Sequence, residues 1–293
     1  MYQNYYGYDA ISDTIVFELD TINTCNFNCP YCEKQKNKWN PNKDEEEWNK
    51  IGNITKLIPF FKSFPYKFRL HLLGGEPTLY PNLEDFLEEL PDADIKLFTN
   101  GSKLDKLEKL AVHRPSITVS IHREYKLKYL MEFIEKGLHK KFKNVKFLIL
   151  LYSLDINLNK YMNYIDILIK NGINFDYYFP FDENGNYRHR FPREIENYQI
   201  LKEKYPLKFD HYKIYENRDN LSQKKLCSKN LWLIDYKSNF RFDGDQTRDI
   251  SFNEIKTIVE SKDFSKFKFE QQQCNTPCWC PANNYYSKIR LPN

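Results

Sequence analysis

The stretch TIVFELDTINTCNFNCPYC, residues 14–32, joins a predicted strand to a loop that carries three cysteines. Its first seven residues are mostly β-branched, aliphatic or aromatic, which is typical of a short buried strand. Similar runs alternate with helical stretches along the chain up to residue 204. The predicted strands are 14–20, 67–73, 94–101 (with its turn), 116–122, 145–152 and 173–181, and the predicted helices are 44–61, 83–90, 103–111, 126–139, 160–171 and 192–204. This alternation indicates an α/β fold with a parallel sheet, either an open sheet or a barrel that lacks two of eight units.

The composition limits the class of protein. The chain has 293 residues, of which 41% are hydrophobic and 16% aromatic, and this excludes an extensively disordered chain. The longest apolar run, residues 147–152, is far shorter than the ~18 residues of a membrane span, and no secretory signal begins the sequence. We therefore expect a soluble, cytoplasmic protein without a membrane partner. The net charge of +4 is spread among mixed charges, which favours a solvated lysine-rich surface over a nucleic-acid interface.

The seven cysteines fall into groups. Cys25, Cys29 and Cys32 form a C-x3-C-x2-C motif, whereas the other four stand near the C-terminus at Cys227, Cys274, Cys278 and Cys280. An odd number of cysteines without a secretory signal favours metal or redox chemistry over disulfides. Three thiolates on one loop are suited to three irons of a cubane and leave the fourth iron open for another ligand. The alternatives are a fragment of a zinc site or three inert core thiols.

Further polar residues follow the next predicted strands, at the edge of a parallel sheet where functional side chains gather. Gly74, Gly75 and Glu76 follow the second strand, and two glycines permit close approach of the backbone to a ligand. The carboxylate beyond them can accept a hydrogen bond from an ammonium group. Asn100 follows the third strand, and Ser120 and His122 close the fourth. A turn role for Asn100 and a strand-capping role for His122 are the alternatives.

The cysteine loop after the first strand resembles that of the radical S-adenosylmethionine (radical SAM) superfamily, whose signature is C-x3-C-x-aromatic-C. The resemblance covers residues 14–204 and implies a partial (β/α)6 TIM-like barrel. It implies that Cys25, Cys29 and Cys32 hold a 4Fe–4S cluster whose open iron chelates SAM. One electron then splits SAM to methionine and a 5′-deoxyadenosyl radical, which takes a hydrogen atom from the substrate. The expected electron donor is a reductase such as flavodoxin or ferredoxin.

The same resemblance implies which residues contact SAM. The Gly-Gly-Glu motif would bind its amino group, Ser120 its ribose or carboxylate, and Tyr31 its adenine. Superfamily members often continue after the serine with an acidic residue, whereas this chain has Ile121 and His122. The full predicted set is Tyr31, Gly74, Gly75, Glu76, Asn100, Ser120 and His122.

Residues 205–293 break the βα rhythm and are predicted to form a small appended module that packs against the barrel. We expect a β-hairpin from Leu231–Asp235 and Phe240–Phe242, a helix at 253–261 and a cysteine-rich tail. The module resembles the auxiliary-cluster appendages called twitch and SPASM, although the region of Gly244 lacks the cysteine those modules usually place there. The predicted ligands are Cys227, Cys274, Cys278 and Cys280, for a second 4Fe–4S cluster or, alternatively, zinc.

These features predict a radical SAM enzyme of the oxidoreductase or epimerase type. The serine–histidine end of the fourth strand resembles that of superfamily members that modify glycans or natural products. This resemblance implies a sugar or other small polar substrate, with epimerisation or dehydrogenation. The first alternative is a peptide- or protein-modifying maturase, and a radical methyltransferase is another. A non-catalytic zinc-binding protein is the alternative from a different class, but it leaves Gly74, Gly75 and Glu76 unexplained.

Overall fold

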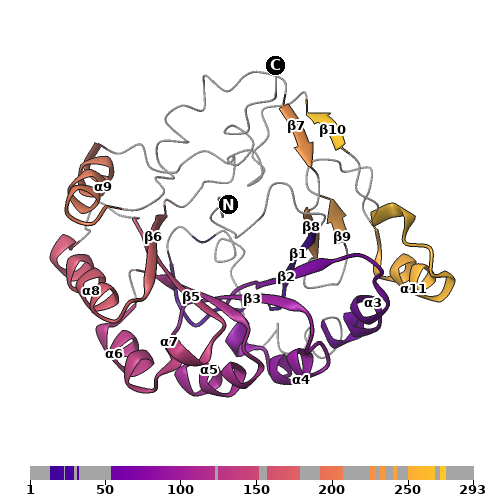
Figure 1. Ribbon diagram of the computed structural model, residues 1–293, viewed down its shortest axis with the longest axis horizontal. Coiled ribbons are helices and arrows are strands. Elements are labelled where there is room, and N and C mark those ends of the chain that lie inside the picture. Colours follow the sequence, from indigo (N-terminus) through magenta and orange to yellow (C-terminus); the bar gives the residue numbers. More distant parts are fainter. Residues whose placement is uncertain are drawn as a thin grey trace.

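A curved parallel sheet forms the centre of the computed structural model (Figure 1). The model describes residues 14–22, 24–29, 32, 54–122, 125–151, 157–178, 192–206, 225–228, 231–234, 240–242, 250–267 and 271–274. Six strands pair in parallel with their neighbours in sequence, which confirms the predicted α/β fold. They are β1 (Ile15–Asp20), β2 (Phe68–Leu73), β3 (Asp94–Thr99), β4 (Ser116–Ile121), β5 (Asn144–Leu150) and β6 (Asn174–Tyr178).

Helices connect these strands along the outer side of the curved sheet (Figure 1). The predicted helix 126–139 is divided because Gly137 adopts a left-handed conformation, with φ of 66°, which ends one helix and precedes the next. The first predicted helix is described only from residue 54 onward. The helices are α3 (Ile58–Ser63), α4 (Leu83–Glu88), α5 (Leu104–Leu110), α6 (Leu127–Glu135), α7 (Leu138–Lys141), α8 (Leu158–Lys170) and α9 (Pro192–Lys204).

The core between sheet and helices includes a cluster of phenylalanine rings around Phe17 of β1. Phe17 is fully buried, and its ring packs edge-on against those of Phe60 and Phe64 at centroid distances of 5.7 and 5.2 Å. Phe240 and Phe267, from the C-terminal part of the chain, lie 6.0 Å from the same ring. Each edge-to-face pair adds about 0.5–1.5 kcal/mol beyond area burial. The cluster therefore fastens C-terminal elements to the first strand.

The predicted hairpin is confirmed, and its place in the sheet is a finding. Strands β8 (Leu231–Ile234) and β9 (Phe240–Phe242) pair antiparallel, while β8 pairs in parallel with β1. The hairpin, which we expected within an appended module, thus continues the main sheet in the order β6-β5-β4-β3-β2-β1-β8-β9. Burial of Trp232 and Phe240 in the common core explains this position. The division of the chain after residue 204 stays a prediction.

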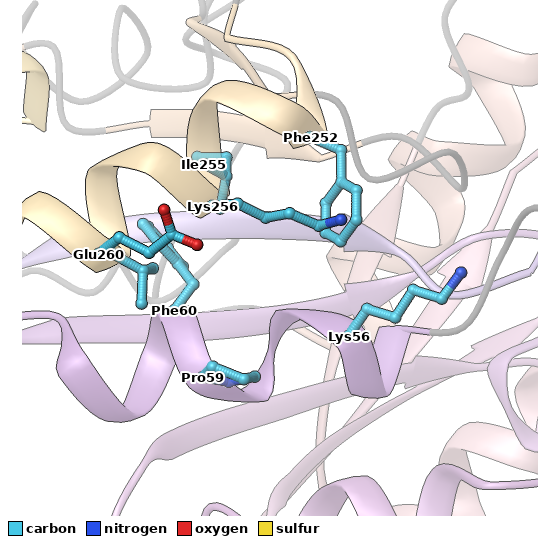
Figure 2. Close-up of a pocket in the computed structure, with 8 residues that line it drawn as sticks. Lys56, Pro59, Phe60, Phe252, Ile255, Lys256 and Glu260 are labelled. Atoms are coloured by element: carbon cyan, nitrogen blue, oxygen red, sulfur yellow. The ribbon is translucent and has the colours of Figure 1, made fainter.

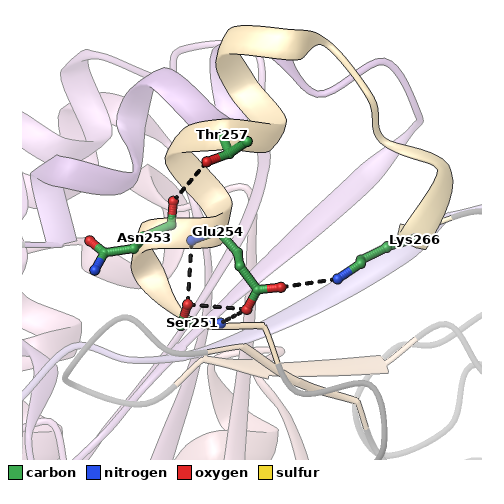
Figure 3. A network of polar contacts seen from close by, with 5 residues as sticks. All are labelled: Ser251, Asn253, Glu254, Thr257 and Lys266. Carbon is green, nitrogen blue, oxygen red and sulfur yellow. Dashed lines mark hydrogen bonds and ion pairs between the residues drawn. The ribbon is translucent and has the colours of Figure 1, made fainter.

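Helix α11 (Phe252–Ser261) matches the helix predicted at 253–261 and begins with a capping box (Figure 3). The Ser251 hydroxyl accepts the N–H of Glu254, and the Glu254 carboxylate accepts the N–H of Ser251. Such a cap satisfies two backbone donors that the first turn leaves open. Lys266 adds an exposed ion pair to Glu254 at 3.1 Å. No helix in the described part of the chain has the length and apolar character that a membrane span requires.

Candidate functional site

The cysteine loop leaves β1 and folds over the carboxyl ends of the neighbouring strands. Cys29 is buried and packs in a small apolar cluster with Phe27, Leu148 and Leu150, against which the half-buried Cys25 and Cys32 also pack. The backbone N–H of Cys32 donates to the carbonyl of Cys29 at 3.0 Å. Cys29 and Cys32 are therefore joined through their backbones, and all three cysteines lie beside apolar side chains that limit access of water.

Hydrogen-bonding groups face two of these thiols. The Sγ atom of Cys25 accepts the backbone N–H of Phe27 at 3.4 Å and the side-chain amide of Asn100 at 3.7 Å. The Sγ atom of Cys29 lies 3.4 Å from Nδ1 of His122. Burial raises the pKa of Cys25 to about 11, and the carboxylate of Glu76 opposes its ionisation as well. A thiolate at this position therefore needs a positive centre, and bound metal supplies one.

The donor set fits an iron–sulfur cubane better than a single ion. Within the described part of the chain, no three His, Cys, Asp or Glu side chains lie close enough to ligate one metal ion. A cubane distributes three thiolates over three irons, whereas tetrahedral zinc requires all its ligands around one centre. The loop supplies the three thiolates expected for a cubane with one open iron, and hydrogen-bonding groups face the sulfurs of Cys25 and Cys29.

Gly74 and Gly75 bring the next loop directly against the stem of the cysteine loop. The N–H groups of Gly75 and Glu76 donate to the carbonyls of Ile22 and Thr24, each at 2.6 Å. A Cβ atom on Gly75 would lie 1.9 Å from the Thr24 carbonyl oxygen, and Gly74 has a φ of 132°. We predicted that the glycines permit approach to a ligand, but the close approach that this structure contains is to the backbone before Cys25.

Glu76 is buried, and its carboxylate accepts four hydrogen bonds. Oε1 accepts the backbone N–H and the hydroxyl of Thr78, at 3.1 and 2.6 Å, and the hydroxyl of Thr99 at 2.6 Å. Oε2 accepts the backbone N–H of Asn100 at 2.6 Å. Burial raises the pKa of Glu76, while these donors oppose the shift. Only one of the four bonds falls on Oε2, so this oxygen retains capacity for a further donor.

Asn100 connects the carboxylate to the cysteine loop. Its backbone N–H binds Glu76, and its side-chain amide donates to Asn26 at 2.9 Å as well as to Cys25. Its Oδ1 accepts the backbone N–H of Ser102 at 3.0 Å, which is an Asx-type turn around Gly101. Asn100 therefore has the predicted turn role and also lies beside the cysteine loop, while its contact with SAM stays a prediction.

Ser120 and His122 lie at the end of β4, on its face away from the helix-side core formed by Val119 and Ile121. Ser120 is half-buried and is in register with Leu148 of β5. His122 contacts the cysteine loop directly, and protein packed around its imidazole lowers its pKa to about 4. Tyr31, the predicted adenine contact, lies outside the described residues.

The structure thus brings together Cys25, Cys29, Glu76, Asn100 and His122, with Cys32 and Ser120 adjacent. Sequence reasoning missed Thr78 and the backbone carbonyls of Ile22 and Thr24. A Glu-Pro-Thr run is a usable signal for Thr78, since Glu76 caps the short 3-10 helix η2 (Pro77–Leu79). Nothing in the side chains of Ile22 and Thr24 indicates that their backbone carbonyls accept these bonds.

Two of the four C-terminal cysteines are placed by backbone pairing. Strands β7 (Lys225–Ser228) and β10 (Gln271–Cys274) form a separate antiparallel pair, in which Cys227 is opposite Gln272 and Cys274 is opposite Lys225. The two cysteine positions therefore lie on neighbouring strands, two residues apart in register. Cys278 and Cys280 lie outside the described residues.

A pocket of about 450 Å³ lies away from this site, between α3 and α11 (Figure 2). Pro59, Phe60 and Ile255 give it apolar walls, and Lys56, Lys256 and Glu260 lie around it. It contains none of the predicted site residues.

Comparisons with known proteins agree with this geometry. The family model described as the Radical SAM superfamily matches residues 19–184, more than half of the chain. The S-adenosylmethionine-dependent nucleotide dehydratase of Fibrobacter sp. (strain UWH6) is 34% identical over 103 residues, which are 31% of this chain and 29% of that protein. The 7,8-dihydro-6-hydroxymethylpterin dimethyltransferase of Methanocaldococcus jannaschii is 30% identical over 106 residues, 34% of this chain and 20% of that protein.

A probable GTP 3′,8-cyclase of Methanococcus maripaludis (strain C5) is 25% identical over 136 residues, 42% of this chain and 44% of that protein. The chain thus spans less than half the length of each of these three relatives. Among solved structures, Streptococcus suis SuiB bound to S-adenosylmethionine matches 78% of this chain and 57% of that chain, with 12% identity and a TM-score of 0.48. Because the family model covers more than half of the sequence, the chain belongs to the radical SAM superfamily, whose members use a 4Fe–4S cluster and SAM.

Proposed function

We propose that this protein binds a 4Fe–4S cluster through Cys25, Cys29 and Cys32 and uses SAM to abstract a hydrogen atom from a sugar or other small polar molecule. The observation that carries the proposal is that Asn100 hydrogen-bonds both to Glu76 and to Cys25 of the cysteine loop. When bound, the cluster and SAM supply an electron and a 5′-deoxyadenosyl radical. A flavodoxin- or ferredoxin-type reductase is the proposed electron source.

The chain's own residues bind and orient the reactants. Oε2 of Glu76 accepts a hydrogen bond from the ammonium group of SAM. The four hydrogen bonds from Thr78, Thr99 and Asn100 keep the carboxylate fixed before SAM binds. Ser120, on the inward side of β4, donates to the ribose or carboxylate. Phe27 and Leu148 shield the thiols from water, which strengthens electrostatic interactions in the site.

The printed names of the relatives support a small substrate. A nucleotide, a hydroxymethylpterin and GTP are each small, polar and cyclic, and none is a peptide. We therefore favour a small polar molecule over the alternative of a peptide or protein substrate. Epimerisation and dehydrogenation remain the proposed reaction types.

The test is SAM cleavage by anaerobically reconstituted protein with dithionite as reductant, measured as 5′-deoxyadenosine. The variant Cys29→Ala should lose formation of 5′-deoxyadenosine at least a hundredfold, because one thiolate ligand is missing. Val112→Ala, at a residue that is 78% exposed, serves as the control and should retain it. Retained 5′-deoxyadenosine formation in Cys29→Ala would contradict the proposal.

We also propose that Cys227, Cys274, Cys278 and Cys280 hold a second 4Fe–4S cluster, in a twitch- or SPASM-like arrangement. The register of β7 and β10 supports it, because Cys227 and Cys274 come from distant parts of the sequence to neighbouring strands. Metal analysis after reconstitution tests the site. We expect about 8 irons per unmodified chain and about 4 per chain of Cys278→Ala. A content of about 4 irons and one zinc in the unmodified chain would indicate the zinc alternative.

A further inference from the structure

The contact between His122 and the cysteine loop has a chemical consequence that binding of SAM does not use. Nδ1 of His122 lies 3.4 Å from Sγ of Cys29, within reach of a hydrogen bond to sulfur. A thiolate that ligates metal carries no proton and can only accept, so the bond requires a proton on Nδ1. The metal-bound state therefore selects one tautomer of the imidazole.

The ring of His122 is held in place by its surroundings. Phe27 of the cysteine loop packs edge-on against it, with centroids 6.0 Å apart and planes at 89°. The backbone carbonyl of His122 accepts the N–H of Tyr125 at 3.0 Å, which fixes the chain just after β4. A donor fixed in this way loses little conformational entropy when it binds the thiolate.

The donors to sulfur are unevenly distributed over the loop. Cys25 receives two N–H groups, from Phe27 and Asn100, and Cys29 faces His122. One of the donors to Cys25, the side-chain amide of Asn100, also binds Asn26. A substitution of His122 therefore removes a contact with the sulfur of Cys29 without removing a hydrogen bond of Glu76.

We propose that His122 is a positioning residue that donates Nδ1–H to the thiolate of Cys29 and thereby raises the reduction potential of the cluster. Reduction adds negative charge, part of which lies on the ligating sulfurs, so a hydrogen bond to sulfur stabilises the reduced state more than the oxidised state. Residues in contact with metal ligands tune metal sites in this way. The inference rests on the proposed cluster at Cys25, Cys29 and Cys32.

The test is a redox titration of the full chain, reconstituted anaerobically without SAM, with iron content measured on the same samples. In His122→Leu the equilibrium constant for reduction should fall about tenfold, which is about 59 mV for one electron. His122→Asn places an amide N–H near the position of Nδ1 and should restore most of the potential. Val112→Ala, at a residue that is 78% exposed, serves as the control, and its potential should match that of the unmodified chain.

An unchanged potential in His122→Leu with full iron content would overturn the inference, as would an equal shift in Val112→Ala. If His122→Leu takes up no iron, the pair His122→Asn and His122→Gln decides, because only asparagine presents its amide at the position of Nδ1. Asparagine should then have the higher potential, and equal potentials would refute the role. Absence of a cluster from the unmodified chain would instead refute the proposed function.

Discussion

Replacement of Glu76 by glutamine tests the central hydrogen-bond network, because it changes the carboxylate without changing its size. Glu76 accepts three bonds at Oε1 and one at Oε2, and two of these come from the backbone N–H groups of Thr78 and Asn100. Either orientation of the substituted side-chain amide turns its NH2 group toward one of these N–H donors. The hydroxyls of Thr78 and Thr99 can rotate to accept, but a backbone N–H cannot.

The stability loss follows from that stranded donor. A buried N–H without a partner costs about 1–3 kcal/mol, so the free energy of unfolding of Glu76→Gln should fall by about that amount. The ammonium of SAM loses a charged acceptor, which is worth about 1.5–3 kcal/mol, or roughly a ten- to hundredfold higher Kd. Denaturant unfolding of the apo chain and anaerobic calorimetry of SAM binding measure the two effects separately.

Thr78→Val is the matched control, since it removes one hydroxyl donor and leaves the carboxylate charged. It should lower the free energy of unfolding by about 1 kcal/mol and change the Kd of SAM less than threefold. The reasoning is refuted if Glu76→Gln binds SAM as tightly as the unmodified chain. Equal losses of SAM affinity in Thr78→Val would show that packing, not the negative charge, determines binding.

Two further predictions concern other parts of the barrel. Gly75→Ala places a Cβ atom 1.9 Å from the Thr24 carbonyl, so it should abolish soluble expression or cluster uptake, whereas Gly172→Ala, with open space around it, should cost about 1 kcal/mol in denaturant unfolding. Burial of Lys96 lowers its pKa to about 7, and the positive charge of the nearby Lys146 contributes to this shift. Because the unfolded chain then binds the extra proton between pH 7 and about 10.4, the free energy of unfolding should rise with pH across this window relative to Lys96→Met. A parallel pH dependence of the two proteins would contradict that pKa shift.

The sequence was sufficient for the six parallel strands because each is a short apolar run between helical segments. It was also sufficient to place Glu76, Asn100 and His122 near the cysteine loop, since the carboxyl ends of parallel strands share one edge. The pairing of β8 with β1 was not predictable in this way. It joins residues more than 200 positions apart, and burial of Trp232 and Phe240 beside Phe17 determines it.

Gly74 and Gly75 make a structural contact that the sequence did not indicate. Their bonds to the Ile22 and Thr24 carbonyls fix the second loop to the stem of the cysteine loop, while Asn100 joins both to the third strand. The Cys25 thiol and the Glu76 carboxylate therefore belong to one hydrogen-bonded unit, joined by Asn100, before any cofactor binds. A substitution in one loop should then change the other, so the effects of Glu76→Gln and Asn26→Ala on cluster uptake should not be additive. Two independent loops that each contact SAM alone would instead give additive effects, and the double variant distinguishes these arrangements.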